Sequence, residues 1–209
     1  MLSSKNIVLE AKNISKYFGT ITALENVNLT VREGECLGVV GDNGAGKSTF
    51  MKVLSGLYKP SSGSLFFDGN KEILSSPKDS QNLGLEMVYQ DLALAGNLPI
   101  GENIFLGREP TKKFGFLKLL DYKKIKELSE AHLDKLKIHV KSAEQKVEEL
   151  SGGQRQAIAI ARATAFNSKI VIMDEPTAAL AIKEVGKVLD LINSLKKMGV
   201  SVIIISHRM

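Results

Sequence analysis

The sequence has a single cysteine, Cys36, among its 209 residues, and only five prolines. One cysteine cannot form an internal disulfide, which excludes a disulfide-stapled secreted fold and favours a reducing, intracellular environment. There is no proline-rich linker, low-complexity tract or internal repeat. The composition, close to the globular average, argues against a largely disordered, collagenous or fibrous protein. The chain therefore has the length and composition of one globular domain, with or without a subdomain.

Long hydrophobic runs are also absent. In the amino-terminal segment, charge returns at Glu10 and Lys12 before an apolar stretch of signal-peptide length has formed. No segment approaches the ~18 continuous apolar residues that a membrane-spanning helix needs. We therefore expect any role at a membrane to be played from its surface, through a partner.

Charge is in modest basic excess, with 28 Lys and Arg against 23 Asp and Glu and a net charge of +5. This excess suits a polyanion such as a nucleotide, or equally a solvated surface with a lysine bias. The clearest basic cluster runs from Lys112 and Lys113 to Lys126, with acidic residues at Asp121 within it and at Glu127 directly after it. Mixed charge of this kind predicts a helix face rather than a nucleic-acid groove.

Hydrophobic patterning alternates between strands and helices. Strands are predicted at 7–11, 27–31, 36–40, 64–68, 170–173 and 200–205. Helices are predicted at 49–57, 122–137, 158–163 and 185–198. The continuous apolar run at 36–40 is typical of a strand buried on both faces. The helix at 122–137 has an apolar face formed by Ile125, Leu128, His132 and Leu136. Such alternation predicts a mostly parallel α/β sheet with a helical insertion.

Residues 41–48 fit the pattern G-x-x-x-x-G-K-[ST] of a phosphate-binding loop. Its glycines let backbone N–H groups surround phosphates, and the helix that follows adds the positive end of its dipole. Lys47 is placed to reach the β- and γ-phosphates, and the Ser48 hydroxyl to bind Mg²⁺. The nucleotide-binding residues predicted here are Gly41, Asp42, Asn43, Gly44, Ala45, Gly46, Lys47, Ser48 and Thr49.

A pair of acids, Asp174 and Glu175, follows the apolar run at 170–173. The end of a parallel strand places Asp174 at the carboxyl edge of the sheet, beside the crevice that holds the phosphate loop. There Asp174 can orient Mg²⁺ through its water shell, and Glu175 can act as general base for the attacking water. The pair is a weak signal alone and a strong one beside a phosphate loop.

A further motif at 150–154 contains Ser151, Gly152, Gly153 and Gln154. Ser151 suits a helix N-cap and the two glycines expose N–H groups, which predicts a second phosphate-binding helix start. One chain rarely needs two such sites for one γ-phosphate. With these motifs in this order and spacing, the whole chain resembles the ATP-binding-cassette (ABC) ATPases, in which this signature acts on nucleotide held by the opposite subunit.

The resemblance implies a P-loop NTPase fold in a single ABC ATPase domain over 1–209. Its RecA-like, mostly parallel core is expected at 1–90 and 160–209, with an N-terminal antiparallel β part and a helical subdomain at 91–159. It also implies three more site residues. Phe18 matches the aromatic that stacks on adenine, although Phe18 taken alone suits a hydrophobic core. Gln90 matches the glutamine that meets Mg²⁺ or the attacking water, and His207 matches the switch histidine that contacts the γ-phosphate.

Two positions depart from the family pattern. Many members have an aspartate where this chain has Ala181, which puts coupling between subunits through this residue in doubt. The chain also ends at Met209, two residues after His207, where members usually continue, so we expect the usual C-terminal end to be lacking.

The sequence around Gln90, the segment 101–109 and residues 178–180 and 206–209 resemble the ATPases of bacterial monosaccharide importers of the ribose, xylose and fructose types. This implies ATP hydrolysis that energises sugar import, with ATP and Mg²⁺ bound in a head-to-tail homodimer or with a second cassette; the signature favours a single cassette. The implied partners are membrane permease subunits and, indirectly, a periplasmic or extracellular sugar-binding protein, with no nucleic acid. The expected location is cytoplasmic, on the inner face of the cell membrane.

Two alternatives stay open at this point. One is an ABC ATPase that acts on nucleic acid or ribosomes, although such proteins carry long coiled coils or a second cassette with a charged linker. The other is a nucleotide-binding module without turnover, which the presence of Glu175 and His207 disfavours.

Overall fold

The computed structural model describes residues 6–178 and 180–206, which form two compact units. The first contains the described residues of Met1–Gln90, Asn167–Pro176 and Leu195–Met209. The second contains those of Asp91–Phe166 and Thr177–Ser194, so the chain crosses between the units several times. The segment expected as core at 160–209 is thereby divided between the two units.

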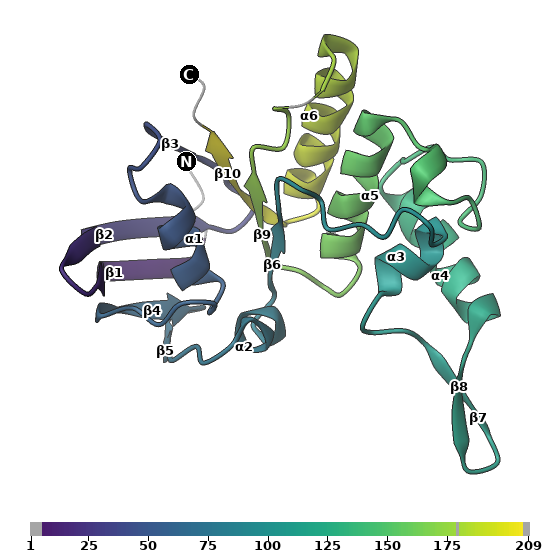
Figure 1. Cartoon of the computed structure of the whole chain (residues 1–209), viewed down its shortest axis with the longest axis horizontal. Coiled ribbons are helices and arrows are strands. Elements are labelled where there is room, and N and C mark those ends of the chain that lie inside the picture. Colours follow the sequence, from purple (N-terminus) through teal and green to yellow (C-terminus); the bar gives the residue numbers. More distant parts are fainter. Residues whose placement is uncertain (1–5, 179, 207–209) are drawn as a thin grey trace. The chain divides into compact units, whose positions relative to one another are not determined.

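The first unit holds two four-stranded sheets (Figure 1). The antiparallel sheet has the order β2-β1-β4-β5, and the parallel sheet has the order β3-β10-β9-β6. Their strands are β1 (Ile7–Phe18), β2 (Ile21–Arg32), β3 (Cys36–Val40), β4 (Ser62–Phe67), β5 (Asn70–Glu72), β6 (Leu85–Val88), β9 (Ile170–Asp174) and β10 (Ser201–Ser206). The predictions of a parallel core sheet and an N-terminal antiparallel part are confirmed.

Helix α1 (Lys47–Leu54) shares one hydrophobic core with both sheets of this unit. Its buried side chains pack with residues of β1, β2 and β4 and with the inner residues of β6, β9 and β10. Helix α2 (Pro77–Asn82) precedes β6. Fixing α1 in this core fixes the loop that leads into it.

Strand β3 corrects one expectation. It pairs with β10 alone among the described strands, and its residues are exposed or half-buried rather than buried on both faces. Leu37 and Val39 pack against the core, while Cys36 and Val40 are exposed on the other face. Because both faces carry apolar residues, the sequence lacks the alternation that would have revealed one open face.

The second unit is mainly helical. Its elements are α3 (Ile100–Phe105), β7 (Thr111–Phe114), β8 (Leu117–Leu120), α4 (Tyr122–Lys135), a 3₁₀ turn (Val147–Glu149), α5 (Gly152–Thr164) and the greater part of α6 (Ile182–Lys197). Helix α3 packs against both α4 and α5. None of the helices in 6–178 and 180–206 combines the length and apolar character that crossing a bilayer requires.

Two features of this unit differ from the sequence-based expectation. Lys112 and Lys113 lie on the hairpin strand β7 and not on a helix, because Gly115 and Phe116 form a turn that the pattern did not reveal. On α4 the buried residues are Ile125, Ser129 and Leu133, whereas Leu128 is 41% exposed. A buried Ser129, whose hydroxyl donates to the Ile125 carbonyl, replaces Leu128 on the core face.

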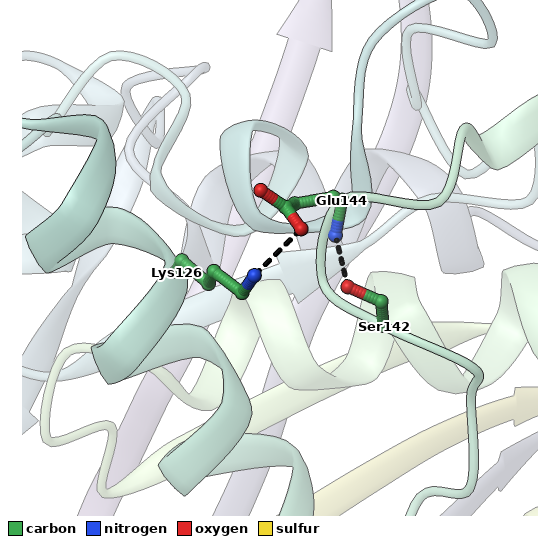
Figure 2. A network of polar contacts seen from close by, with 3 residues as sticks. All are labelled: Lys126, Ser142 and Glu144. Carbon is green, nitrogen blue, oxygen red and sulfur yellow. Dashed lines mark hydrogen bonds and ion pairs between the residues drawn. The ribbon is translucent and has the colours of Figure 1, made fainter.

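Polar contacts secure the loops between these helices. Figure 2 shows the Lys126 ammonium 2.6 Å from a Glu144 carboxylate oxygen, and the Glu144 N–H donating to the Ser142 hydroxyl at 3.1 Å. The ion pair raises the pKa of Lys126. The fully buried Asn103 accepts from the Ala95 N–H at 2.8 Å and donates to three carbonyls, including that of Leu98. Asn103 thereby holds the segment that follows Gln90.

Candidate functional site

The chemistry-bearing residues of the first unit lie where parallel strands end. The register pairs Val40 of β3 with Ser206 of β10, and Ile205 with Asp174 of β9. Met173 is paired in turn with Val88 of β6. The loop from Gly41, the Asp174–Glu175 pair and Gln90 therefore all follow the same edge of one sheet. This is the edge at which parallel α/β sheets bind ligands.

The loop 41–46 enters α1 through an unusual backbone turn. Gly46 is the N-cap of α1 with φ 83°, and a Cβ there would lie 2.5 Å from the Ala23 carbonyl oxygen and 2.8 Å from Leu24 Cδ2. Only glycine fits this position without strain. Lys47, Ser48 and Thr49 form the first turn of α1, where free N–H groups and the helix dipole favour an anion.

The Lys47 side chain bends back over the loop. Its ammonium donates to the Gly41 carbonyl at 2.5 Å and to the Asp42 carbonyl at 2.8 Å. The loop residues that follow Gly41 are exposed to solvent: Asp42, Asn43, Gly44 and Ala45. A cation held beside an exposed glycine-containing loop that leads into a helix start suits the binding of phosphate.

Asp174 and Glu175 differ in backbone and in charge environment. Burial, and next the charge of Glu175, raise the pKa of Asp174, while Lys47 and Lys52 lower it. Glu175 has φ 47° and donates its N–H to the Ile205 carbonyl at 3.0 Å, so the chain turns sharply where β9 ends. The turn keeps both acids at the edge of the sheet.

No group of three or more His, Cys, Asp or Glu that could hold a metal occurs among the described residues. Mg²⁺, however, commonly takes one or two carboxylates, several waters and the oxygens of a bound phosphate. Asp174, whose charge Lys47 and Lys52 offset only in part, fits that donor set together with Ser48 and Gln90 from the same sheet edge.

Three further residues were predicted for the site: Phe18, Gln90 and His207. Phe18 at the end of β1 is 42% exposed, so it is not a core residue. Its ring meets Tyr58 edge-on at 5.4 Å, and the Lys16 ammonium lies 5.1 Å from its centroid. Gln90 is exposed two residues beyond β6. His207 lies outside the described residues.

The signature motif forms the start of α5 in the second unit. The Ser151 hydroxyl oxygen accepts from the Gln154 N–H at 3.3 Å, and the Gln154 side chain accepts from the Ser151 N–H at 3.0 Å. This reciprocal capping box leaves Gly152 and Gly153 as the first residues of the helix. The predicted helix start is therefore present, with an N-cap serine.

Glu184, in the first turn of α6, is a site residue that sequence reasoning missed. The Ser151 hydroxyl donates to its carboxylate at 2.9 Å, and this bond and the Gly153 N–H lower the pKa of Glu184. A Cβ on Gly153 would lie 2.9 Å from that of Glu184, so the approach requires glycine. The two residues are 33 positions apart in sequence, and no local pattern links them.

Comparisons with known proteins agree with this geometry. The family described as ABC transporter matches residues 24–178. The chain is 50% identical to the xylose/arabinose import ATP-binding protein XylG of Sulfolobus acidocaldarius over 200 residues, covering 96% of this chain and 78% of XylG. It is 43% identical to the fructose import ATP-binding protein FrcA of Rhizobium meliloti, covering 97% and 79%.

Other relatives are longer. The ribose import ATP-binding protein RbsA of Rhodopirellula baltica is 43% identical, and the match covers 100% of this chain and 40% of RbsA.

Among solved structures, the ADP conformation of MJ1267, an ATP-binding cassette of an ABC transporter, has a TM-score of 0.84 at 29% identity, covering 97% of this chain and 82% of that one. The dimeric cassette MJ0796 has a TM-score of 0.75 at 30% identity, covering 95% and 88%.

Proposed function

The chain belongs to the ABC transporter family of ATP-binding proteins, and from this premise we propose that it hydrolyses Mg·ATP to energise import of a monosaccharide across the cytoplasmic membrane. The observation that carries the proposal is the shared sheet edge, where the phosphate loop, Asp174 and Gln90 follow neighbouring parallel strands. The names of XylG, FrcA and RbsA support a sugar as cargo, which other subunits would select.

Each residue has a role in this proposal. The loop N–H groups and Lys47 hold the β- and γ-phosphates, and Phe18 stacks on adenine. Ser48, Asp174 and Gln90 would hold Mg²⁺, which when bound neutralises charge on the phosphates. Glu175 accepts the proton of the attacking water, and His207 contacts the γ-phosphate.

The signature would act on nucleotide bound by a second subunit in a head-to-tail dimer. Support comes from the Glu184 carboxylate, which accepts from the Ser151 hydroxyl at the start of α5 and whose pKa Ser151 and the Gly153 N–H lower. The dimeric form of MJ0796 also supports pairing of cassettes. ATP would favour the closed dimer and hydrolysis would reopen it, which couples nucleotide to transport.

The proposed place of action is the cytoplasmic face of the membrane. The segment after Gln90, which Asn103 holds in place, would receive a helix of the permease. The periplasmic or extracellular sugar-binding protein then acts through the permease and not on this chain. Both a homodimer of single cassettes and pairing with a second cassette satisfy the composite site.

The test is steady-state Mg·ATP hydrolysis at increasing protein concentration. We expect activity to rise more steeply than linearly, because each site needs two subunits.

Glu175→Gln should abolish turnover and accumulate ATP-dependent dimers, and Lys47→Ala should weaken nucleotide binding itself, whereas the exposed control Glu33→Gln should change neither. Unchanged turnover in Glu175→Gln would remove Glu175 as the base, and bound ATP without any turnover would favour the non-hydrolysing alternative.

A further inference from the structure

The hairpin of β7 and β8 is the part of the second unit that the proposed function does not use. Its strands pair antiparallel from Thr111↔Leu120 to Phe114↔Leu117, and they pair with no other described strand. In Figure 1 the hairpin projects from the segments that join it to α3 and α4. A two-stranded hairpin is at best marginally stable in water on its own, so an additional surface would stabilise it.

Its large apolar side chains are turned to solvent. Phe114 is 72% exposed and Phe116, at the turn, is 97% exposed. Leu117, Leu119 and Leu120 are exposed as well. Single exposed apolar residues are ordinary on protein surfaces, but such a set within one short hairpin marks an interaction site.

Charge on the same hairpin has one sign. Residues 111–120 contain Lys112, Lys113 and Lys118 and no acidic residue. The register places Lys113 opposite Lys118 on one face, and Phe114 opposite Leu117 on the other. Like charges directly opposite one another destabilise a hairpin. An anionic surface would therefore reduce the repulsion between Lys113 and Lys118.

From these observations we propose that the hairpin docks on an anionic phospholipid surface. Its aromatic turn and leucines enter the interface, and its lysines meet lipid phosphates. A nucleic acid would pair with the lysines but leave Leu117, Leu119 and Leu120 uncovered. This function is separate from ATP turnover and would hold the subunit against the bilayer beside its permease.

The test is sedimentation of the whole chain with vesicles of phosphatidylcholine alone or with about one third phosphatidylglycerol, without nucleotide. We expect binding to the anionic vesicles only. Since each lysine near such a surface contributes about fivefold in partitioning, the variant K112Q/K113Q/K118Q should lose at least about tenfold. The control K71Q/K78Q/K141Q removes three exposed lysines elsewhere and should lose much less.

The aromatic contribution is tested by F114S/F116S, which keeps every charge. We expect it to lose binding at least about tenfold, because two interfacial rings are removed. Both residues are exposed, so the fold should tolerate the change, and circular dichroism and Mg·ATP hydrolysis check that it does.

Three results would overturn the proposal: no binding of the natural chain to anionic vesicles, equal losses in the hairpin and control lysine variants, or unaltered binding by F114S/F116S. Hairpin variants that bind vesicles normally but no longer co-purify with a permease would assign the hairpin to a protein partner. Because vesicle binding is read without ATP, failure of this proposal and failure of the ATPase assignment are distinguishable.

Discussion

At the residue scale, Asp174 carries a charge that the protein alone does not fully offset. Its pKa is raised by burial and by the neighbouring Glu175, and the opposing effects of Lys47 and Lys52 are smaller. The protonated side chain therefore stabilises the fold, and this contribution is fully present below the ordinary pKa of 3.8 and is lost as pH rises through the raised value. Above that raised pKa the ionised acid costs stability, which a bound cation would recover.

Asp174→Asn should accordingly raise the thermal stability of the nucleotide-free protein while impairing turnover. After allowance for solvent screening we expect a gain of about 0.5 kcal/mol, or about 1–2 °C at neutral pH. The gain should shrink as the pH approaches 3.8, and hydrolysis should fall at least about tenfold. Thermal melts across pH check the first expectation, and a lower melting temperature at neutral pH would contradict it.

The pKa of Glu184 is shifted in the opposite direction from that of Asp174: hydrogen bonds from Ser151 and Gly153 lower it and favour the anionic carboxylate. If the start of α5 receives a partner's γ-phosphate, this carboxylate must move away. Glu184→Gln keeps a hydrogen-bond acceptor and removes the charge, so we expect half-maximal dimer formation at about threefold lower ATP. Size-exclusion chromatography with ATP measures this, against Asp190→Asn on the same helix. A higher ATP requirement would show that Glu184 instead supports the signature.

At the scale of elements, the entry into α1 depends on the close approach of Gly46 to β2. Gly46→Ala places a Cβ 2.5 Å from the Ala23 carbonyl at φ 83°, whereas the same change at Gly44, φ 86°, meets no atom within 4 Å. We expect a loss of roughly 3 kcal/mol or more for Gly46→Ala and about 1 kcal/mol for Gly44→Ala. Chemical denaturation compares them, and equal losses would mean that strain and not contact controls the loop.

The elements also show where pattern reading succeeds and where it fails. The strand ending at Asp174 and the helix opened by the phosphate loop were predictable, because short apolar runs and glycine motifs are local signals. The β7–β8 hairpin was not, because its lysines and leucines suit a helix equally well. On α4, the polar Ser129 occupies a buried position and Leu128 an exposed one, which inverts the expected pattern.

At the scale of the whole molecule, the chain divides its chemistry between two compact units. The phosphate loop, Asp174, Glu175 and Gln90 belong to the first, and Ser151 with Glu184 to the second. Each unit is assembled from separate stretches of chain, and the segment Thr177–Ser194 belongs to the helical unit although the parallel core surrounds it in sequence. In the proposed composite site, one subunit would offer the phosphate loop of its first unit and its partner the signature of its second unit.

The sequence alone determined the identity of the motifs, their order and the parallel core, because phosphate-binding loops and buried strands depend on residues that are near one another in the chain. Tertiary structure decided what depends on distant residues. It brought Gly46 against Ala23, raised the pKa of Asp174, and joined Ser151 to Glu184 across 33 positions. Burial, close approach and charge pairing are properties of neighbours in space, and only the folded chain fixes those neighbours.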